Sequence, residues 1–310
     1  MDTRPNYEGR PLAKPDEEIF DQGLGFDLGT LMRRRTVLRA IGVGAIGLGL
    51  AACGDNGDSG DSGGTSTSAS TSSGEIPNET AGPYPGDGSN GPDVLEQSGV
   101  VRSDIRSSFG GTGDKTAEGV PMTLELTIKD LANGGAGFAG TAVYVWHCDR
   151  DGKYSLYSEG ITDQNYLRGV QIADASGKVT FTSIFPACYD GRWPHIHFEV
   201  YPGQADITDS TKAIATSQVA LPADVCTTVY AASGYEQSVT TFAKVSLDSD
   251  NVFGDDQGAS QLGTVTGDVT SGHTVALSVG VDTRTTASGG GQAPPGGGGG
   301  TPPSGAPPTR

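Results

Sequence analysis

The sequence predicts an all-β fold, an antiparallel β-sandwich with short helical insertions. Over several short segments apolar residues alternate with polar ones, which is the period of two that a strand with one buried face requires. Turns rich in glycine and aspartate separate these segments, and little of the chain shows a helical pattern. Many short strands with few helices are typical of two packed antiparallel sheets.

The clearest strand is predicted at residues 120–129, where every second residue is apolar. The other predicted strands, in chain order, are 141–147, 178–185, 195–201, 214–221, 261–269 and 274–281. One short helix is expected at 223–232, because Pro222 suits the start of a helix.

Composition divides the chain into four parts. Residues 76–283 have the mixed composition of a folded domain. The Gly/Ser/Thr-rich stretch 53–75 is predicted to be a flexible linker, and the Gly/Pro-rich tail 284–310 lacks the apolar residues to bury a core. Residues 1–52 are predicted to be a signal peptide of the twin-arginine lipoprotein type.

The signal peptide is predicted from arginines at 33–35 followed by an uncharged stretch, 40–52, that ends at Cys53. This stretch is too short to cross a membrane but suits the apolar part of a signal peptide. The paired arginines resemble a twin-arginine signal, and residues 50–53 resemble a bacterial lipobox. We therefore expect export and lipid anchoring through Cys53, on the outer face of the cytoplasmic membrane or at the cell surface.

The charge of the chain restricts the kinds of partner that it can bind. The net charge is −17, and the residues after Ala52 hold 30 acidic and 13 basic side chains, so nucleic acid is excluded as a partner.

Cys148, Cys188 and Cys226 remain in the exported part. An oxidising compartment permits one disulfide among them, and the sequence leaves the three pairings open.

The chemistry is expected at His195 and His197, which lie two residues apart on a predicted strand. Both imidazoles then project from one face, while Ile196 and Phe198 point toward the core. Two imidazoles on one face suit a shared metal ion, although a pair of surface histidines fits the same pattern.

The segments 145–155, 166–171 and 185–198 together closely resemble the intradiol ring-cleaving dioxygenases, the family of catechol 1,2-dioxygenase and protocatechuate 3,4-dioxygenase. The resemblance runs from about residue 79 to residue 218 in the order Tyr…Tyr…RxxHxH. It implies one non-haem Fe(III) held by two tyrosinates and two histidines: Tyr154, Tyr189, His195 and His197. Hard anionic oxygens in such a set favour Fe(III) over Fe(II).

The resemblance also implies the reaction and three catalytic residues. The family cleaves a catechol ring between its two hydroxyl-bearing carbons with O₂, giving a cis,cis-muconate-type diacid, so a small aromatic diol and O₂ are the expected partners. Tyr189 would leave the iron and accept a substrate proton. Arg192 would stabilise negative charge on the substrate, and Gln218 matches a supporting glutamine of the family.

Other candidate residues are expected to be structural or solvated. Tyr144 and Trp146 are predicted to pack in the core and His147 to form structural hydrogen bonds, while a pocket-lining position for Tyr84 stays open. His273 lies between glycine-rich turns and is expected to be solvated. A solvated acidic loop is favoured over a Ca²⁺ site for Asp248, Asp250, Asp255 and Asp256.

A second class of function stays open: a surface-tethered module that binds aromatic or polysaccharide material without catalysis, which an anchor and a linker would suit. The short spacing from Tyr189 to His195 predicts an open pocket. Because no long N-terminal helical dimerisation region is visible, we expect a monomer or a weak oligomer.

The anchor is tested by replacing Cys53 with Ala. Since the thiol is the expected site of lipidation, the variant should leave the membrane fraction for the soluble fraction on cell fractionation. A Cys53→Ala protein that stays with membranes would contradict the lipobox.

Overall fold

The computed structural model describes residues 6–7, 10–11 and 74–285. The chain divides into two units, residues 1–65 and residues 66–310. In the first unit, β1 (Asn6–Tyr7) and β2 (Arg10–Pro11) form an antiparallel pair. The rest of the predicted signal peptide, Cys53, the linker before Gly74 and the tail after Thr285 lie outside the described residues.

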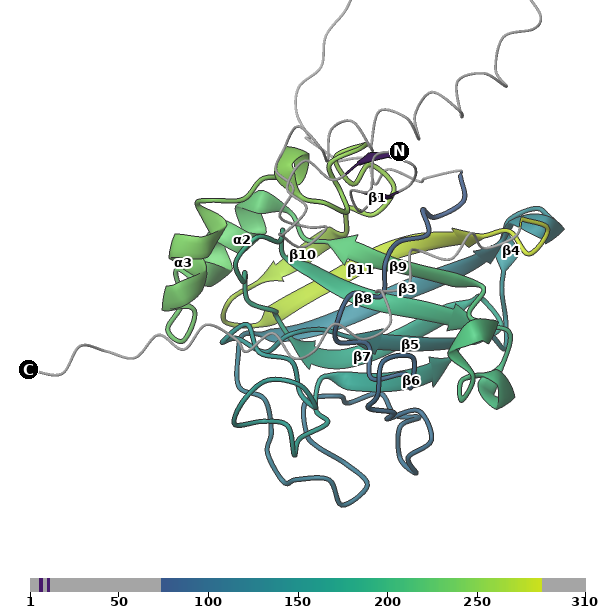
Figure 1. The fold of residues 1–310 in the computed structure, drawn as a ribbon, viewed down its shortest axis with the longest axis horizontal. Helices are drawn as coiled ribbons and strands as arrows, with labels where there is room; N and C mark the ends of the chain where they lie inside the picture. The colour runs from purple at the N-terminus through teal and green to yellow at the C-terminus, as the bar shows by residue number, and fades with distance from the viewer. Residues whose placement is uncertain (1–5, 8–9, 12–73, 286–310) are drawn as a thin grey trace, which may run out of the picture. The chain divides into compact units, whose positions relative to one another are not determined.

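Two β-sheets build the second unit (Figure 1). The five strands of the first sheet are β10 (Thr264–Asp268), β11 (Gly272–Val281), β3 (Pro121–Asp130), β4 (Ala136–Gly137) and β7 (Lys178–Ile184). The four strands of the second sheet, in spatial order, are β6 (Arg168–Ile172), β5 (Ala142–Trp146), β8 (His195–Tyr201) and β9 (Ala215–Ala220).

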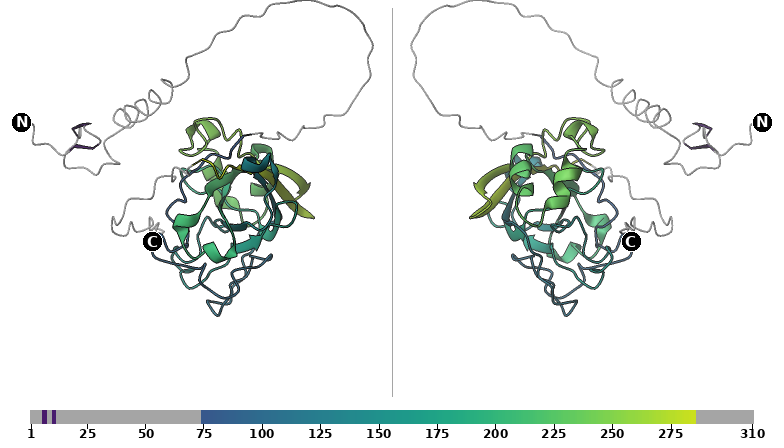
Figure 2. Two further views of the ribbon diagram at one scale, coloured as in Figure 1. Left: turned by 90° about the vertical axis from the view of Figure 1, so that its right-hand side faces the viewer. Right: turned by 90° about the vertical axis from the view of Figure 1, so that its left-hand side faces the viewer.

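Helices are short and lie outside the sheets. Two α-helices, α2 (Ala223–Tyr230) and α3 (Glu236–Phe242), follow β9 and lie at one end of the unit (Figure 1). The 3₁₀ helices in the described part of the chain are η2 (Leu131–Asn133), η3 (Gln204–Asp206), η4 (Ser210–Lys212) and η5 (Leu247–Ser249). The irregular segment before β3 contributes the long blue loops at another end of the unit in both views of Figure 2.

The core lies between the two sheets. In β3 the predicted alternation is confirmed, since Leu124, Leu126 and Ile128 are buried while the residues between them are partly exposed. Phe181 of β7 and Phe198 of β8, which belong to different sheets, lie in the same hydrophobic cluster. Burying one such side chain contributes about 1.5–3 kcal/mol, so this shared cluster holds the two sheets together.

One pairing corrects the predicted antiparallel topology. Strand β11 runs parallel to β3, with His273 opposite Met122 and Val281 opposite Asp130, while the other paired strands of the two sheets are antiparallel. Alternation along a strand indicates which face is buried, but it carries no information on the neighbouring strand or its direction. Strands β4 and β6 and helix α3 were not predicted.

His273 is not solvated, as the sequence suggested, but lies at the start of β11. It is only 6% exposed, and its ring packs against Phe185 with 5.8 Å between ring centroids. Pairing with β3 brings the end of the predicted turn into the sheet and buries the imidazole.

Cys148, Cys188 and Cys226 are all buried, and none of these three forms a disulfide in the described structure. Burial raises the pKa of Cys188 to about 11, so this thiol is protonated at neutral pH. None of the helices in the described residues combines the length and the apolar character needed to cross a membrane.

Candidate metal centre

Four side-chain donor atoms converge beside the second sheet. The phenolic oxygens of Tyr154 and Tyr189 are 3.4 Å apart, and the Tyr189 oxygen is 3.1 Å from Nε2 of His195. The Nε2 atoms of His195 and His197 are 3.0 Å apart. The structure therefore brings together all four residues that the resemblance names as ligands.

Strand β8 fixes both imidazoles. Its two-residue period places His195 and His197 on one face and Ile196 and Phe198 in the core between the sheets. The ring of His197 stacks on Trp146, opposite it on β5, with ring centroids 4.8 Å apart and an interplanar angle of 5°. The neighbouring strand β5 thus fixes the orientation of the His197 imidazole by ring stacking.

A backbone carbonyl selects the tautomer of His195. Nδ1 of His195 lies within hydrogen-bond distance of the Trp193 carbonyl oxygen, which can only accept. The proton therefore sits on Nδ1, and the lone pair of Nε2 points toward the Tyr189 hydroxyl and His197. This is the arrangement that metal-binding histidines use, with one nitrogen held by an acceptor and the other left for the ion.

The tyrosines come from two loops that approach each other closely. Asp149 organises the first loop, because its carboxylate accepts hydrogen bonds from the backbone N–H groups of Asp151 and Lys153. At Gly152, with φ of +78°, a Cβ atom would lie 3.2 Å from Cβ of Tyr189, so glycine permits both the turn and the approach. Tyr154 is buried and Tyr189 is half-buried.

Burial makes charge unfavourable on each of these four groups. It is the main cause that raises the pKa of Tyr154 and of Tyr189 above the ordinary phenol value. Burial, with the positive charge of Arg192, lowers the pKa of His195 to about 3, and burial with neighbouring cations lowers that of His197 well below its usual range. The imidazoles are therefore neutral and can offer lone pairs, while the phenols ionise only beside a strong Lewis acid.

The donor set fits a hard cation. Among the described residues, no three His, Cys, Asp or Glu side chains lie close enough together to hold a metal ion. A metal at His195 and His197 therefore depends on the oxygens of Tyr154 and Tyr189. Two phenolates and two imidazoles suit Fe(III) better than Zn²⁺, because anionic oxygen ligands match a hard trivalent ion.

Arg192 lies beside this cluster and is held by two side chains. Its Nε donates to Oδ2 of Asp250 at 2.9 Å, and its Nη2 donates to Oε1 of Gln218 at 2.7 Å. Gln218 lies opposite His197 on β9, and its Nε2 donates to the Thr80 carbonyl oxygen. The structure thus places both predicted catalytic residues, Arg192 and Gln218, next to the four donor residues.

Asp250 corrects the expectation of a solvated acidic loop. Its side chain is fully buried and accepts hydrogen bonds from Arg192 and from the backbone N–H groups of Trp193, Val252 and Phe253. The other members of the predicted acidic cluster, Asp248, Asp255 and Asp256, are exposed. No local pattern distinguishes Asp250 from these three, since its partner Arg192 lies 58 residues away in the chain.

Arg168 joins the two walls of the site. It lies in the segment 166–171 that resembles the family, but no role was predicted for it. Its buried guanidinium donates to the carbonyl oxygens of Tyr84, Pro85 and Ser155, at 2.9, 2.7 and 2.9 Å. The segment before Pro85 is thereby tied to the loop that carries Tyr154. Three of its acceptors are backbone carbonyl oxygens, which have no sequence signature. It also donates to the hydroxyls of Ser155 and Tyr144.

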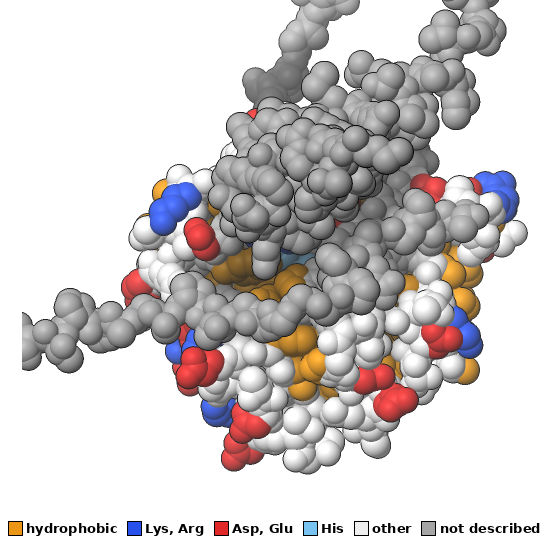
Figure 3. Space-filling model, viewed as in Figure 1, with side chains coloured by type: hydrophobic (Ala, Val, Ile, Leu, Met, Phe, Trp, Pro, Cys, Tyr) orange, Lys and Arg blue, Asp and Glu red, His pale blue; other side chains and the backbone are white. Residues whose placement is uncertain are grey.

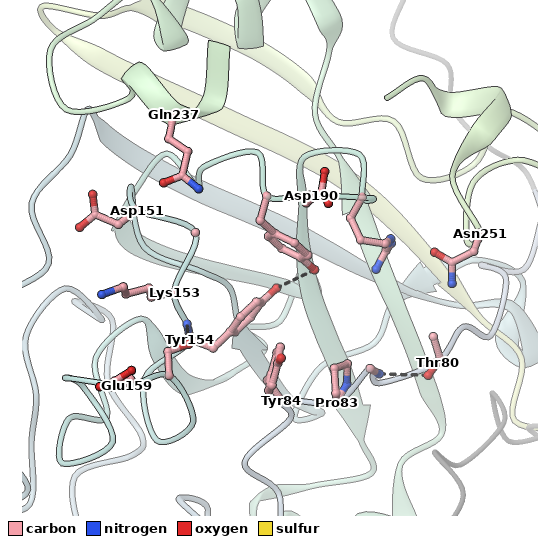
Figure 4. A pocket seen from close by; sticks show the side chains of 15 residues that line it. Thr80, Pro83, Tyr84, Asp151, Lys153, Tyr154, Glu159, Asp190, Gln237 and Asn251 are labelled. Carbon is pink, nitrogen blue, oxygen red and sulfur yellow. Dashed lines mark hydrogen bonds between the residues drawn. The ribbon is translucent and has the colours of Figure 1, made fainter. Parts of the chain in front are cut away.

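A cavity of 1010 Å³ opens beside Tyr154 and Tyr189 (Figure 4). Tyr84, which the sequence left open, lines this cavity, and its ring lies 4.9 Å from that of Tyr154 between centroids. Arg192 lines it as well, so the cavity meets the predicted catalytic arginine and both tyrosines.

The residues predicted to be structural are structural. Tyr144 and Trp146 are fully buried, and the Tyr144 hydroxyl donates to the Pro85 carbonyl oxygen at 2.6 Å. The ring nitrogens of His147 contact the Cys148 carbonyl oxygen and the Ser183 hydroxyl.

Comparison with known proteins places this chain in a family. A family model described as a dioxygenase matches residues 90–261, which is more than half of the chain. The chain belongs to the intradiol ring-cleaving dioxygenase family. The matched residues contain all four donor residues together with Arg192, Gln218 and Asp250.

Curated relatives of this chain are similar over part of their length. A chlorocatechol 1,2-dioxygenase of Rhodococcus opacus is 30% identical over 101 residues, which cover 28% of this chain and 38% of the relative. A catechol 1,2-dioxygenase of Pseudomonas sp. (strain EST1001) is 34% identical over 76 residues, which cover 24% of each chain. The matches therefore span less than half the length of these relatives.

A solved structure shares the fold. An intradiol ring-cleavage dioxygenase from Tetranychus urticae superposes with a TM-score of 0.54 at 21% identity, covering 67% of this chain and 95% of that one. At this identity the likeness shows the fold alone.

The Arg192–Asp250 pair is tested through its effect on stability. Burial alone would raise the pKa of Asp250, but hydrogen bonds and charge from Arg192 and backbone N–H groups outweigh burial and lower it. Asp250→Asn should therefore lower the free energy of unfolding at pH 7 by about 3–5 kcal/mol, the usual cost of breaking a buried ion pair. Urea unfolding of both proteins gives this difference.

The pH dependence of that difference has a defined sign. A carboxyl whose pKa is lower in the folded than in the unfolded state contributes its full stabilisation above the unfolded-state pKa of about 3.9, and this contribution is lost progressively as the pH falls from there through the folded-state pKa. The two proteins should converge in stability as the pH falls below about 4. An undiminished difference at pH 3 would show that Asp250 does not act through its charge.

Proposed function

We propose that this protein is a non-haem Fe(III) dioxygenase that cleaves a catechol-type ring between its two hydroxyl-bearing carbons. The other substrate would be O₂ and the product a cis,cis-muconate-type diacid. The observation that carries the proposal is the convergence of two phenolic oxygens and two imidazole nitrogens at the wall of a cavity, in a chain of the intradiol family.

Tyr154, Tyr189, His195 and His197 would hold the iron. When bound there, Fe(III) would supply Lewis acidity and a template for the two catechol oxygens. The protein contributes the orientation of the ligands: the Trp193 carbonyl oxygen sets the tautomer of His195, and the Trp146 ring fixes the plane of His197.

Tyr189 is the tyrosine best placed to exchange with substrate. Both phenols line the cavity, but Tyr189 is half-buried whereas Tyr154 is 2% exposed. The oxygen of Tyr189 would take a proton from a catechol hydroxyl, because a free phenol at this buried position has a pKa above its ordinary value. Tyr154 would remain in place.

Arg192 would stabilise negative charge that develops on the bound ring. Its guanidinium lines the cavity, and Asp250 and Gln218 hold it through Nε and Nη2. A cation fixed before the reaction needs no reorganisation when charge develops, which is the source of electrostatic rate enhancement. Gln218 would thus act by positioning Arg192.

We further propose that the enzyme is exported, is tethered through a lipidated Cys53 and works as a monomer or a weak oligomer. Support comes from the arginine-rich and apolar sequence before Cys53 and from the linker composition that follows it. The catechol and O₂ would then reach the enzyme from outside the cell.

Two variants separate metal binding from rate enhancement. His197→Ala should lose three things together: the iron, the visible colour of tyrosinate bound to Fe(III), and oxygen uptake. The reason is that the imidazole would be a direct ligand. Arg192→Met combined with Asp250→Asn should keep iron and colour while turnover falls by about 10²–10³, the usual effect of losing one preorganised charge. The second substitution is included because Met alone would leave the Asp250 carboxylate buried without its cation.

Asp250→Asn alone is the matched control, and oxygen uptake over a series of catechols is the assay. The proposal fails if the wild-type protein consumes no oxygen with any catechol. Near-wild-type turnover in the double variant would remove Arg192 from the reaction.

A further inference from the structure

The cavity is much larger than a single catechol ring needs. A space of about 150 Å³ accommodates benzene, whereas this cavity measures 1010 Å³. One wall carries the phenols of Tyr154 and Tyr189, and the remaining lining extends well beyond them. A substrate can therefore bring a substituent that lies along the rest of the lining.

The residues around that extra space carry an excess of negative charge. The described cavity lining contains three carboxylates, Asp151, Glu159 and Asp190, and two cations, Lys153 and Arg192. The lining residues thus carry three negative and two positive charges, and Asp250, paired with Arg192 behind the lining, adds a fourth negative charge.

The three carboxylates are exposed and positioned so that they can interact with a ligand in the cavity. Asp151, Glu159 and Asp190 are exposed, so their side chains contact water at the rim. Asp151 and Glu159 lie on the same side of the cavity in Figure 4, with Lys153 between them in that view. Charges of one sign around a concave opening add their fields and raise the local concentration of oppositely charged ligands.

Carboxylates also lie near the opposite wall. Thr80 lines the cavity there, and Glu79 precedes it. Burial is the main cause that raises the pKa of Glu79 to about 7, and the charges of Asp255 and Asp256 raise it further, so these two carboxylates act on this wall. Acidic side chains are visible at several places on this face of the molecule in Figure 3, among fewer basic ones.

Aromatic side chains favour the same ligand. Tyr84 is 37% exposed, and its ring packs on those of Tyr154 and Tyr157, with centroid distances of 4.9 and 5.2 Å. Aromatic faces attract cations through the ring quadrupole and also accept neutral apolar groups.

We propose that this cavity selects catechols whose ring substituent is neutral or positively charged, and that it discriminates against catechols that carry a carboxylate. The proposal rests on the proposed function and specifies its substrate class. Asp151 and Glu159 are the specificity-determining residues, since they contribute charge at the rim and are not among the four donor residues.

The test compares three catechols with side chains at the same ring position: 4-ethylcatechol (neutral), dopamine (cationic) and 3,4-dihydroxyphenylacetate (anionic). Binding to the iron-loaded protein is measured by calorimetry without oxygen, and kcat/KM is measured with oxygen. We expect dopamine to exceed dihydroxyphenylacetate by about tenfold in both quantities at low ionic strength, because attraction and repulsion act in opposite senses on the two probes. The ratio should shrink in 0.5 M salt, which screens exposed charges.

The double variant Asp151→Asn, Glu159→Gln should reduce that ratio by about threefold or more. The matched control is Glu96→Gln, Asp114→Asn, which removes the same charge from two exposed positions that do not line the cavity. A ratio that falls equally in both variants would assign selectivity to net charge alone and would contradict the role of the rim.

The outcomes of this test distinguish the proposed selectivity from the proposed activity. Cleavage of catechol with equal or tighter binding of the anionic probe contradicts the selectivity and leaves the activity intact. The expected order of binding without oxygen consumption supports the selectivity and contradicts the activity. A loss of more than tenfold in dihydroxyphenylacetate affinity in Lys153→Met would show that Lys153 captures carboxylates and would overturn the proposal.

Discussion

The site depends on crowding four donor atoms into a volume that disfavours charge on each of them. The Nε2 atoms of His195 and His197 are 3.0 Å apart, and two phenolic oxygens complete the cluster. Burial drives the pKa values of the imidazoles down and those of the phenols up. Four neutral donors directed at one another are a poor structural core but a suitable shell for a small, highly charged cation.

The surrounding fold serves to hold this arrangement. Strand β8 uses one face for Ile196 and Phe198, which anchor it in the core shared by the two sheets, and the other face for the two histidines. Around the cluster, Arg168 ties the segment before Pro85 to the Tyr154 loop, and Asp250 holds Arg192. Each of these contacts joins segments far apart in the chain, so rigidity at the site comes from tertiary structure.

Local patterns were enough to predict what depends on local geometry. The two-residue period predicted β3 and β8 and the common face of His195 and His197. The resemblance selected Tyr154 and Tyr189 from the tyrosines of the chain, and the structure brings them together with the histidines. A β-rich fold with short helices follows from the same patterns.

Long-range pairing could not be predicted in this way. The parallel contact of β11 with β3 buries His273, although its glycine-rich neighbourhood suggested a solvated turn. Asp250 lies in an acidic stretch whose other aspartates are exposed, and only its distant partner Arg192 explains its burial. Arg168 binds backbone carbonyl oxygens, which any sequence can supply.

Metal content of the purified protein tests the central claim most directly. If the two phenols and two imidazoles form the proposed shell, elemental analysis should find about one iron per chain. The protein solution should also be red-brown, which is the colour that tyrosinate bound to Fe(III) gives to enzymes of the family. Stoichiometric zinc or copper without visible absorption would contradict the account.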